Sequence, residues 1–426
     1  MAPTPHPRVR LLGHADPLRI PELARQLTQS YFIWDGFVAG ARRVDLHPLV
    51  LPDRLHELAR SAAEAVTRVV SGVARRALHH SGERRLYGLH PDVERLAEAS
   101  DAAGDDAALV RVDLLLNAGE SAGEGEGVTA CEINADCPGG HNEAFGLPRL
   151  ARAAGYLAGG NPTMVVEALA SRLAELAAGG VVALIFATAY AEDLQVCALL
   201  QRELTRRGVE AILAPATAPK VAGREVVVRG RAVKVVYRFF PTEYMEGQSN
   251  LGGLADAIAG GRVRTLTGFS HIYTQSKYAF ARAWGGRGEL SGDDRRVVTA
   301  HLPPTYDVED VPPRDLVADR EGWVLKRAYG RVGDEVLVGP LTPVDMWRDF
   351  VEKVRGRRAR GESWIAQRFV RQATVPTPWG ERYVTLGVYV LDGKFVGYFA
   401  RLTRESHVSH GALCVPVFHA PTPEAS

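Results

Sequence analysis

Apolar residues recur every three or four positions between Pro48 and Leu78, among residues that favour helix. This spacing predicts an amphipathic helix, and residues 1–100 as a whole have a mostly helical pattern. The pattern changes at 108–116 and 129–134, two short apolar runs that predict strands. A stretch rich in Gly, Ser and Glu separates them and predicts a solvated hairpin loop.

A β-α-β pattern fills the middle of the chain. The run VVALIFATA is typical of a buried strand, and an amphipathic helix separates it from a second strand. Such a unit predicts a parallel sheet with helices on its faces. The elements expected here are a Gly/Pro turn at Cys137–Gly140, a helix to about Ala158, a helix at Val165–Leu176, the strand at 181–189, a helix at Asp193–Arg207, a strand at Ala211–Pro215, and a hairpin of Arg224–Val228 and Arg231–Tyr237.

The last third of the chain, from about Gly322, is rich in predicted strands. A turn at Leu391–Gly393 favours a hairpin. A proline-rich stretch at 303–313 is the best candidate for a linker. We therefore expect an α/β fold class with α+β elements. The elements expected in this third are strands at Trp323–Lys326, Glu335–Val338, Trp364–Phe369, Tyr383–Val390 and Lys394–Leu402, and a helix at Val344–Arg357.

Composition excludes several classes of protein. The 51 Lys and Arg residues balance 50 Asp and Glu residues, which argues against a nucleic-acid partner. The longest strongly apolar stretch, Val181–Ala191, is far shorter than the ~20 residues that span a bilayer, so no membrane partner is expected. The N-terminus has no apolar signal core, so a cytoplasmic location is expected. Four scattered cysteines predict reduced thiols rather than a zinc site or a disulfide framework.

Lysine is rare in this chain, since only six of its 51 cationic residues are lysines and the rest are arginines. Each lysine is therefore a candidate for a role that needs a compact ammonium group. Lys277 follows Ser276 at the start of a predicted helix, where a cation is unfavourable unless it meets an anion such as phosphate. An ordinary surface lysine is the alternative.

The first hairpin carries the most suggestive polar side chains. Strand alternation puts Arg111 and Asp113 on one face, and Glu132 and Asn134 on one face. The position of the loop places Asp113 roughly opposite Glu132. Hard oxygen ligands suit Mg²⁺, and an adjacent guanidinium suits a phosphoryl group in transfer. The alternative is a half-exposed hairpin whose outer face is merely polar.

Two later segments suit a nucleotide. A strand delivers Lys326, and glycines at Gly330 and Gly333 would let backbone N–H groups approach phosphates. The order of a P-loop is missing, and a plain β-turn is the alternative. The strand edge around Gln367 and Phe369 could contact an adenine, although core packing is the alternative for these residues and for the strands around Tyr389 and Arg401.

These four segments, in this order, resemble the glutathionylspermidine synthase family, a member of the circularly permuted branch of the ATP-grasp ligases. The best match is R-V-D at Arg111–Asp113 followed by E-I-N-A-D-C-P at Glu132–Pro138. The permutation would explain why the metal ligands come early and the lysine-bearing strands come late. Supporting matches are S-K at Ser276-Lys277, the K…G-R-x-G loop at Lys326–Gly333 and I-A-Q-R-F at Ile365–Phe369.

The resemblance implies a set of site residues and two cofactors, ATP and Mg²⁺. It implies that the two lysines bind the α- and β-phosphates of ATP and that the glycine loop forms a lid over the γ-phosphate. The implied residues are Asp113, Glu132 and Asn134 for Mg²⁺, Arg111 for the transferred phosphoryl group and the tetrahedral intermediate, Lys277, Lys326, Gly330, Arg331 and Gly333 for the phosphates, and Gln367 and Phe369 for the border of the adenine.

The chain departs from the family pattern at two places. In the lid, Arg327 stands where the family has a proline, and Val332 stands where it has an acidic residue. After Pro138, His141, Asn142 and Glu143 replace a small hydroxyl residue. They would serve a different substrate or form a local turn network.

The resemblance implies an ATP-dependent carboxylate–amine ligase that forms an amide bond through an acyl phosphate. Its partners would be small-molecule or peptide carboxylates and amines. A non-catalytic ATP-binding or regulatory ATP-grasp module and a kinase-like phosphotransferase stay open as alternatives. The expected regions are a helical region at 1–105, the metal-binding hairpin and its helix at 106–160, a pre-ATP-grasp-like β-α-β unit at 161–265 and the nucleotide-binding subdomains at 266–426.

Overall fold

The strand that carries Arg111 and Asp113 lies in a sheet built from distant parts of the chain. The computed structural model describes residues 9–11, 21–38, 40–118, 127–156, 159–330, 335–407 and 411–421. The sheet order is β21-β20-β19-β5-β6, and every neighbouring pair is antiparallel. Its strands are β5 (Leu109–Leu116), β6 (Val128–Asn134), β19 (Arg382–Leu391), β20 (Lys394–Thr403) and β21 (Leu413–Val415), with β18 (Thr374–Val375) paired to β19.

The two predicted hairpins of this sheet are confirmed. The β5–β6 hairpin lies where the alternation pattern placed it, although most of its loop is outside the described residues. The β19–β20 hairpin turns at Asp392 and Gly393, whose φ angles are both positive as a type I′ turn requires. The pairing of β19 with β5 joins residues far apart in sequence, and nothing in the local pattern predicts it.

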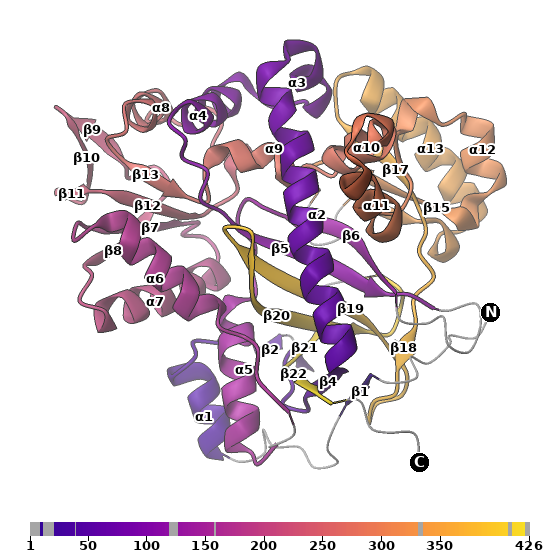
Figure 1. The fold of residues 1–426 in the computed structure, drawn as a ribbon, viewed down its shortest axis with the longest axis horizontal. Coiled ribbons are helices and arrows are strands. Elements are labelled where there is room, and N and C mark those ends of the chain that lie inside the picture. The colour runs from indigo at the N-terminus through magenta and orange to yellow at the C-terminus, as the bar shows by residue number, and fades with distance from the viewer. Residues whose placement is uncertain are drawn as a thin grey trace.

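The helix α2 (Asp53–His79) lies across this sheet (Figure 1). Its buried residues recur every three or four positions and pack with the apolar side chains of β5, β6 and β19 in one core. The mostly helical prediction is therefore right from residue 53 to residue 102, but short strands occupy much of the described segment before it. The other elements here are β1 (Arg10–Leu11), α1 (Pro21–Gln29), β2 (Phe37–Val38), β3 (Ala41–Arg42), β4 (Leu49–Pro52), α3 (Ser81–Tyr87) and α4 (Pro91–Ala102), and β4 pairs in parallel with β22 (Val417–Ala420).

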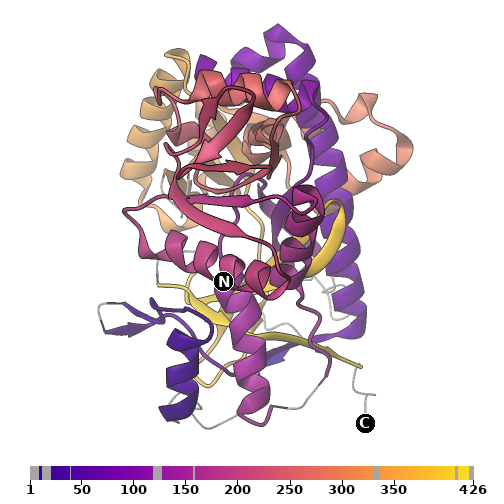
Figure 2. The same cartoon turned by 90° about the vertical axis from the view of Figure 1, so that its left-hand side faces the viewer.

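The predicted parallel sheet in the middle of the chain is confirmed. Its order is β13-β12-β7-β8, and all three pairings are parallel. The helices α6 and α7 pack on one face, and α8 lies on the other beside α4 (Figures 1 and 2). The elements of this unit are α6 (Val165–Ala177), β7 (Val182–Phe186), α7 (Ala191–Arg206), β8 (Ala211–Pro215), β12 (Val235–Phe239), α8 (Leu251–Ala259) and β13 (Arg264–Leu266).

One predicted strand of this unit is wrong in its extent. The expected strand Arg231–Tyr237 divides at Lys234 into β11 (Arg231–Val233) and β12. The first part pairs with β10 (Glu225–Val228) in a small antiparallel sheet that also holds β9 (Lys220–Ala222), whereas the second part enters the parallel sheet. A continuous apolar run does not reveal such a change of partner, because both strands bury valines.

The third sheet has the order β14-β17-β15-β16 and is covered by α12 (Pro313–Ala318) and α13 (Val344–Ala359).

The expectation of a proline-rich linker at 303–313 is wrong. This stretch contains β14 (Thr305–Asp307), which pairs with β17 (Trp364–Arg368), and Thr305 is fully buried. Proline lacks only its own N–H, so it is tolerated beside a short edge strand. The remaining elements are α5 (His141–Ala153), α9 (Ile272–Gln275), α10 (Tyr278–Gly285), α11 (Gly292–His301), β15 (Trp323–Arg327) and β16 (Val336–Val338).

Among the described residues, every helix is too short or too polar to cross a lipid bilayer.

Candidate functional site

The β5–β6 hairpin gathers four polar residues on one face. Arg111 is paired with Asn134, and Asp113 is paired with Glu132, as the alternation pattern predicts. The register shifts directly after Asp113, so Cys131 is an extra residue in β6. The β5 side of the face is covered, since Arg111 is 6% exposed and Asp113 is fully buried, whereas Glu132 and Asn134 on β6 are half-buried.

Asp113 is held by two arginines. Arg111 donates from Nε to Oδ1 (2.7 Å) and from Nη2 to Oδ2 (3.0 Å). Arg401, from β20, donates from Nη2 to Oδ2 (2.6 Å), and the Asn134 amide donates to the same oxygen (3.2 Å). Burial alone would raise the pKa of Asp113, but the two guanidiniums lower it far below its ordinary value. Both guanidiniums therefore favour the ionised form of the Asp113 carboxyl group.

The sequence related Arg401 to the site only through the strand that contains it. Its strand was expected to be able to line the cleft, but no sequence pattern connects it with Asp113. The contact arises because β19 lies between β5 and β20, and Thr385 of β19 pairs with both Leu115 and Arg401. Arg401 thus adds a second guanidinium to the site.

A glycine carbonyl fixes the orientation of Arg111. Its Nη1 donates to the carbonyl oxygen of Gly139 (2.8 Å), and the hydroxyl of Tyr389 donates to the same oxygen (2.5 Å). Gly139 lies in the turn between β6 and α5, which was predicted from its Gly and Pro residues. Arg111 is therefore held at both ends of its guanidinium, by Asp113 and by this turn.

The two candidate lysines both meet the hairpin. Lys326 Nζ donates to the Cys131 carbonyl (3.0 Å) and to Gln367 Oε1 (2.7 Å). Lys277 Nζ donates to the Gly330 carbonyl (2.7 Å) and lies 3.7 Å from Glu132 Oε2. Both side chains are less than a tenth exposed, so neither is an ordinary surface lysine.

A glutamine joins the segment of Lys277 to the end of the hairpin. The buried side chain of Gln275 accepts hydrogen bonds at Oε1 from the backbone N–H groups of Ala135 (2.8 Å) and Asp136 (3.1 Å). Lys277 occupies the N-cap position of α10, and its own N–H donates to the Ala328 carbonyl (3.0 Å) directly after β15. Three of the predicted segments are therefore connected through backbone groups as well as side chains.

The residues predicted for the adenine border and for the glycine loop differ in burial and in whether they are described. Gln367 is buried and also donates to Thr305 Oγ1 (3.1 Å), whereas Phe369 is half-buried beyond the end of β17. Arg331 and Gly333 lie outside the described residues, as does the rest of 331–334, so only Gly330 of the expected lid Gly330–Gly333 is described.

His141, Asn142 and Glu143 begin α5 beside this site. Asn142 donates to the carbonyls of Tyr31 (2.9 Å) and Gln195 (3.1 Å), which is a structural contact between α5 and its neighbours. Burial, together with Asp35 and Glu192, raises the pKa of Glu143 to about 8. The two hydrogen bonds of Asn142 therefore agree with the alternative in which His141, Asn142 and Glu143 form a local network.

The donor set fits a magnesium ion in part. Glu132 is partly exposed, at 28% of its side chain, and it faces Lys277. Asn134 uses its Nδ2 toward Asp113, so its oxygen is left to bind a cation. Asp113 Oδ2 already accepts three hydrogen bonds and must lose one to bind a metal directly. No cluster of three His, Cys, Asp or Glu side chains that could hold a metal occurs in the described ranges, and Mg²⁺ usually needs only one or two carboxylates beside phosphates and water.

Glycine is required at position 387 because the Arg111 side chain and the Phe399 carbonyl lie close to its backbone. Gly387 lies opposite Asp113, and a Cβ there would be 2.8 Å from Arg111 Cδ and 2.9 Å from the Phe399 carbonyl. We expect Gly387→Ala to displace Arg111 and to destabilise the protein by about 1–3 kcal/mol. Urea unfolding measures this effect. Gly72→Ala, which would meet no atom within 4 Å in α2, is the control and is expected to be neutral or slightly stabilising; equal behaviour of the two variants would contradict the steric argument.

The buried imidazole of His141 predicts sensitivity to acid. Burial, with a smaller contribution from Arg111, lowers the pKa of His141 to about 3 from its ordinary value of 6.5. Below pH 6.5 the unfolded chain therefore binds a proton that the folded protein does not. We expect the free energy of unfolding to fall by up to roughly 1.4 kcal/mol per pH unit as the pH drops from the ordinary pKa toward the folded one.

Urea unfolding of His141→Phe tests this expectation. The variant should lose less stability than the wild type when the pH falls from about 7 to about 5, because no imidazole remains to be protonated. His80→Phe, which replaces an exposed histidine, should follow the wild type. Parallel pH profiles for the wild type and His141→Phe would contradict the prediction.

Comparison with known proteins adds a family and a fold. The family model described as "Glutathionylspermidine synthase preATP-grasp" matches residues 50–418. A glutathione synthetase-like effector from Globodera pallida has a similar structure, with a TM-score of 0.60 and 11% identity over 96% of this chain and 98% of that chain. A putative gamma-glutamylcysteine synthetase from Methylobacillus flagellatus KT is a weaker match, with a TM-score of 0.44 and 14% identity over 82% of this chain and 85% of that chain. None of the curated proteins compared with the chain matches it. The mixed α/β fold expected from the sequence is thus confirmed, and it is similar to the fold of the Globodera pallida effector.

Proposed function

Because this chain belongs to the glutathionylspermidine synthase pre-ATP-grasp family, we propose that it is an ATP-dependent ligase that joins a carboxylate to an amine. One observation carries the proposal: Lys277 and Lys326, from segments far along the chain, both contact the hairpin that holds Arg111 and Asp113. A nucleotide triphosphate needs such a combination of cations and carboxylates. The arrangement of the segments also supports a circular permutation and the four regions at 1–105, 106–160, 161–265 and 266–426.

In the proposed reaction, the protein contributes position and charge. Lys277 and Lys326 bind the α- and β-phosphates of ATP, and Gln367 and Phe369 border the adenine. Glu132 and Asn134, with Asp113 after it loses a hydrogen bond, would hold Mg²⁺. When bound, that ion neutralises phosphate charge. The loop from Gly330 to Gly333, with Arg331, forms the lid and keeps water from the reactive acyl group.

Arg111 is the residue proposed to act on the reacting atoms. An oxygen of the substrate carboxylate attacks the γ-phosphorus of ATP, the bond to the leaving oxygen breaks, and ADP departs. The amine then attacks the acyl carbon, phosphate leaves with the electrons of the carbon–oxygen bond, and the amine loses a proton. Arg111, fixed by Asp113 and Gly139, stabilises the negative charge that develops in both steps.

Nucleotide binding must break contacts that the protein makes in this structure. Lys277 donates to the Gly330 carbonyl and Lys326 to Gln367, so the lysines exchange neutral acceptors for phosphate oxygens. Charge-assisted hydrogen bonds to phosphate are stronger than those to neutral acceptors, which makes the exchange favourable.

Release of ADP over a matrix of carboxylates and amines, with Mg²⁺ present, tests the proposal. We expect a signal that requires one carboxylate and one amine together. ADP release with an alcohol alone would instead show a phosphotransferase. Nucleotide-induced thermal stabilisation with no ADP release for any pair would show a binding module, and either result would contradict the ligase.

A further inference from the structure

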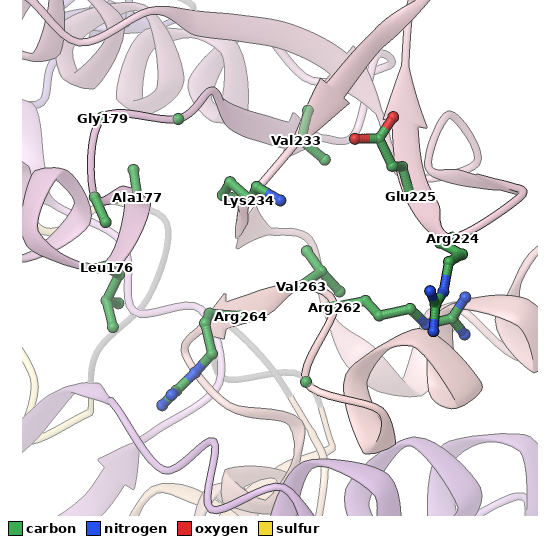
Figure 3. A pocket seen from close by; sticks show the side chains of 13 residues that line it. Leu176, Ala177, Gly179, Arg224, Glu225, Val233, Lys234, Arg262, Val263 and Arg264 are labelled. Carbon is green, nitrogen blue, oxygen red and sulfur yellow. The ribbon is translucent and has the colours of Figure 1, made fainter.

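A cavity of about 520 Å³ lies at the edge of the parallel sheet where its strands begin (Figure 3). Its walls come from the end of α6, the start of β12 at Lys234, the start of β13 at Arg264 and the turn before β10. The candidate functional site lies beyond the opposite, carboxyl end of β12, where Arg238 forms an ion pair with Asp136. The cavity is therefore separate from the site described above.

Four cationic side chains and one carboxylate line this cavity. They are Arg224, Lys234, Arg262, Arg264 and Glu225. Arg264 is paired with Asp105 (2.9 Å). The side chains of Arg224, Lys234 and Arg262 have no carboxylate partner and no hydrogen-bond acceptor among the described residues. Figure 3 labels Arg224, Lys234 and Arg262 among the side chains that line the cavity. Even with the Glu225 carboxylate counted, these three cations leave an excess of positive charge in one concave region, and a bound anion would offset it.

The ends of α6 and α8 do not account for these cations. A helix C-terminus carries roughly half a negative charge, so two of them offset about one cation. Their terminal carbonyls are already satisfied by the backbone: Gly180 N–H donates to the Ala177 carbonyl (2.7 Å), and Gly261 N–H donates to the Ile258 carbonyl (2.8 Å). A net positive charge is therefore left in the cavity.

We propose that this cavity, here called the basic pocket, binds an organic phosphate of nucleotide size. Its volume is in the range of sites that hold small cofactors. Lys234, Arg224 and Arg262 supply donors for phosphate oxygens, and guanidinium groups bind them in bidentate geometry. The rest of the wall is mixed: it holds the Glu225 carboxylate and glycine backbone beside the apolar residues Leu176, Ala177, Val233 and Val263.

Calorimetric titration of the full chain with ADP and, separately, with inorganic pyrophosphate tests the proposal. Each titration is repeated with Lys326→Ala, which removes the contribution of the candidate functional site. In that background we expect ADP still to bind, and Lys234→Gln or Arg262→Gln to weaken binding about tenfold. Lys220→Gln, an exposed lysine on neighbouring β9 that does not line the pocket, is the matched control and should bind as the parent does.

The outcomes separate the proposal from its alternatives. Tighter binding of ADP than of pyrophosphate supports a nucleotide in the basic pocket, and equal binding supports a site for the diphosphate group alone. Loss of all binding in Lys326→Ala, or no effect of Lys234→Gln and Arg262→Gln, would overturn the proposal. Neither result depends on ligase activity, so the proposed function is tested separately.

Discussion

Replacing Lys326 with alanine is expected to abolish turnover, with a loss of at least about 1,000-fold in the rate of ADP release. The Lys326 ammonium group lies between the Cys131 carbonyl and Gln367 Oε1, in the position proposed for the α- and β-phosphates. Without it, two phosphates lose a buried positive charge at short range. Glu132→Ala should have a comparable effect, because it removes a partly exposed candidate ligand for Mg²⁺ and the partner of Lys277.

Controls separate chemistry from folding in this experiment. Lys353→Ala removes an exposed lysine from α13 and should keep full activity. Lys326→Met keeps the apolar stem of the buried side chain and should be inactive with an unchanged unfolding midpoint. Full activity in Lys326→Ala or in Glu132→Ala would reject the site.

The second large effect is expected at an ion pair that connects the hairpin to the parallel sheet. Arg238 Nη1 lies 2.6 Å from Asp136 Oδ1, and both side chains are fully buried. Asp136 also accepts hydrogen bonds from the Thr242 hydroxyl (2.6 Å) and backbone N–H (2.9 Å). Asp136→Asn leaves a buried guanidinium without a counter-charge, and we expect it to destabilise the protein by about 3–5 kcal/mol in urea unfolding.

A double-mutant cycle tests the origin of that effect. Arg238→Met combined with Asp136→Asn should destabilise the protein by clearly less than the sum of the two single changes, because no unpaired charge is left. The exposed pair Arg95–Asp256 (2.8 Å, side chains 57% and 65% exposed) is the control, and Asp256→Asn should cost less than about 1 kcal/mol. Additive single changes would contradict the argument.

Alternation along two strands was enough to identify the centre of the candidate site. Because side chains alternate between the faces of a strand, Arg111, Asp113, Glu132 and Asn134 could be assigned to one face from their spacing, and the position of the loop gave the register. The scarcity of lysine pointed to Lys277 and Lys326. These are local signals, since each depends on a few consecutive residues.

Several features of the site could not be found in this way. Arg401, Gln275 and Gly387 reach the hairpin through β20, α9 and β19, and no spacing in the sequence relates them to Asp113. The contact between Arg238 and Asp136 depends on how the parallel sheet is placed against the turn after β6. The same limitation explains the two errors, the supposed linker at 303–313 and the undivided strand at Arg231–Tyr237.

The sequence by itself determined the first and last hairpins, the long helix α2 and the parallel β-α-β unit, which face of the first hairpin is polar, and which family the motifs resemble. Only the tertiary structure decided that β19 separates β5 from β20, that two arginines share Asp113, and that the basic pocket forms where the parallel strands begin. The physical reason is that periodicity is a property of neighbouring residues. The pairing of distant strands depends instead on the packing of the whole chain, where many local patterns are compatible with more than one partner.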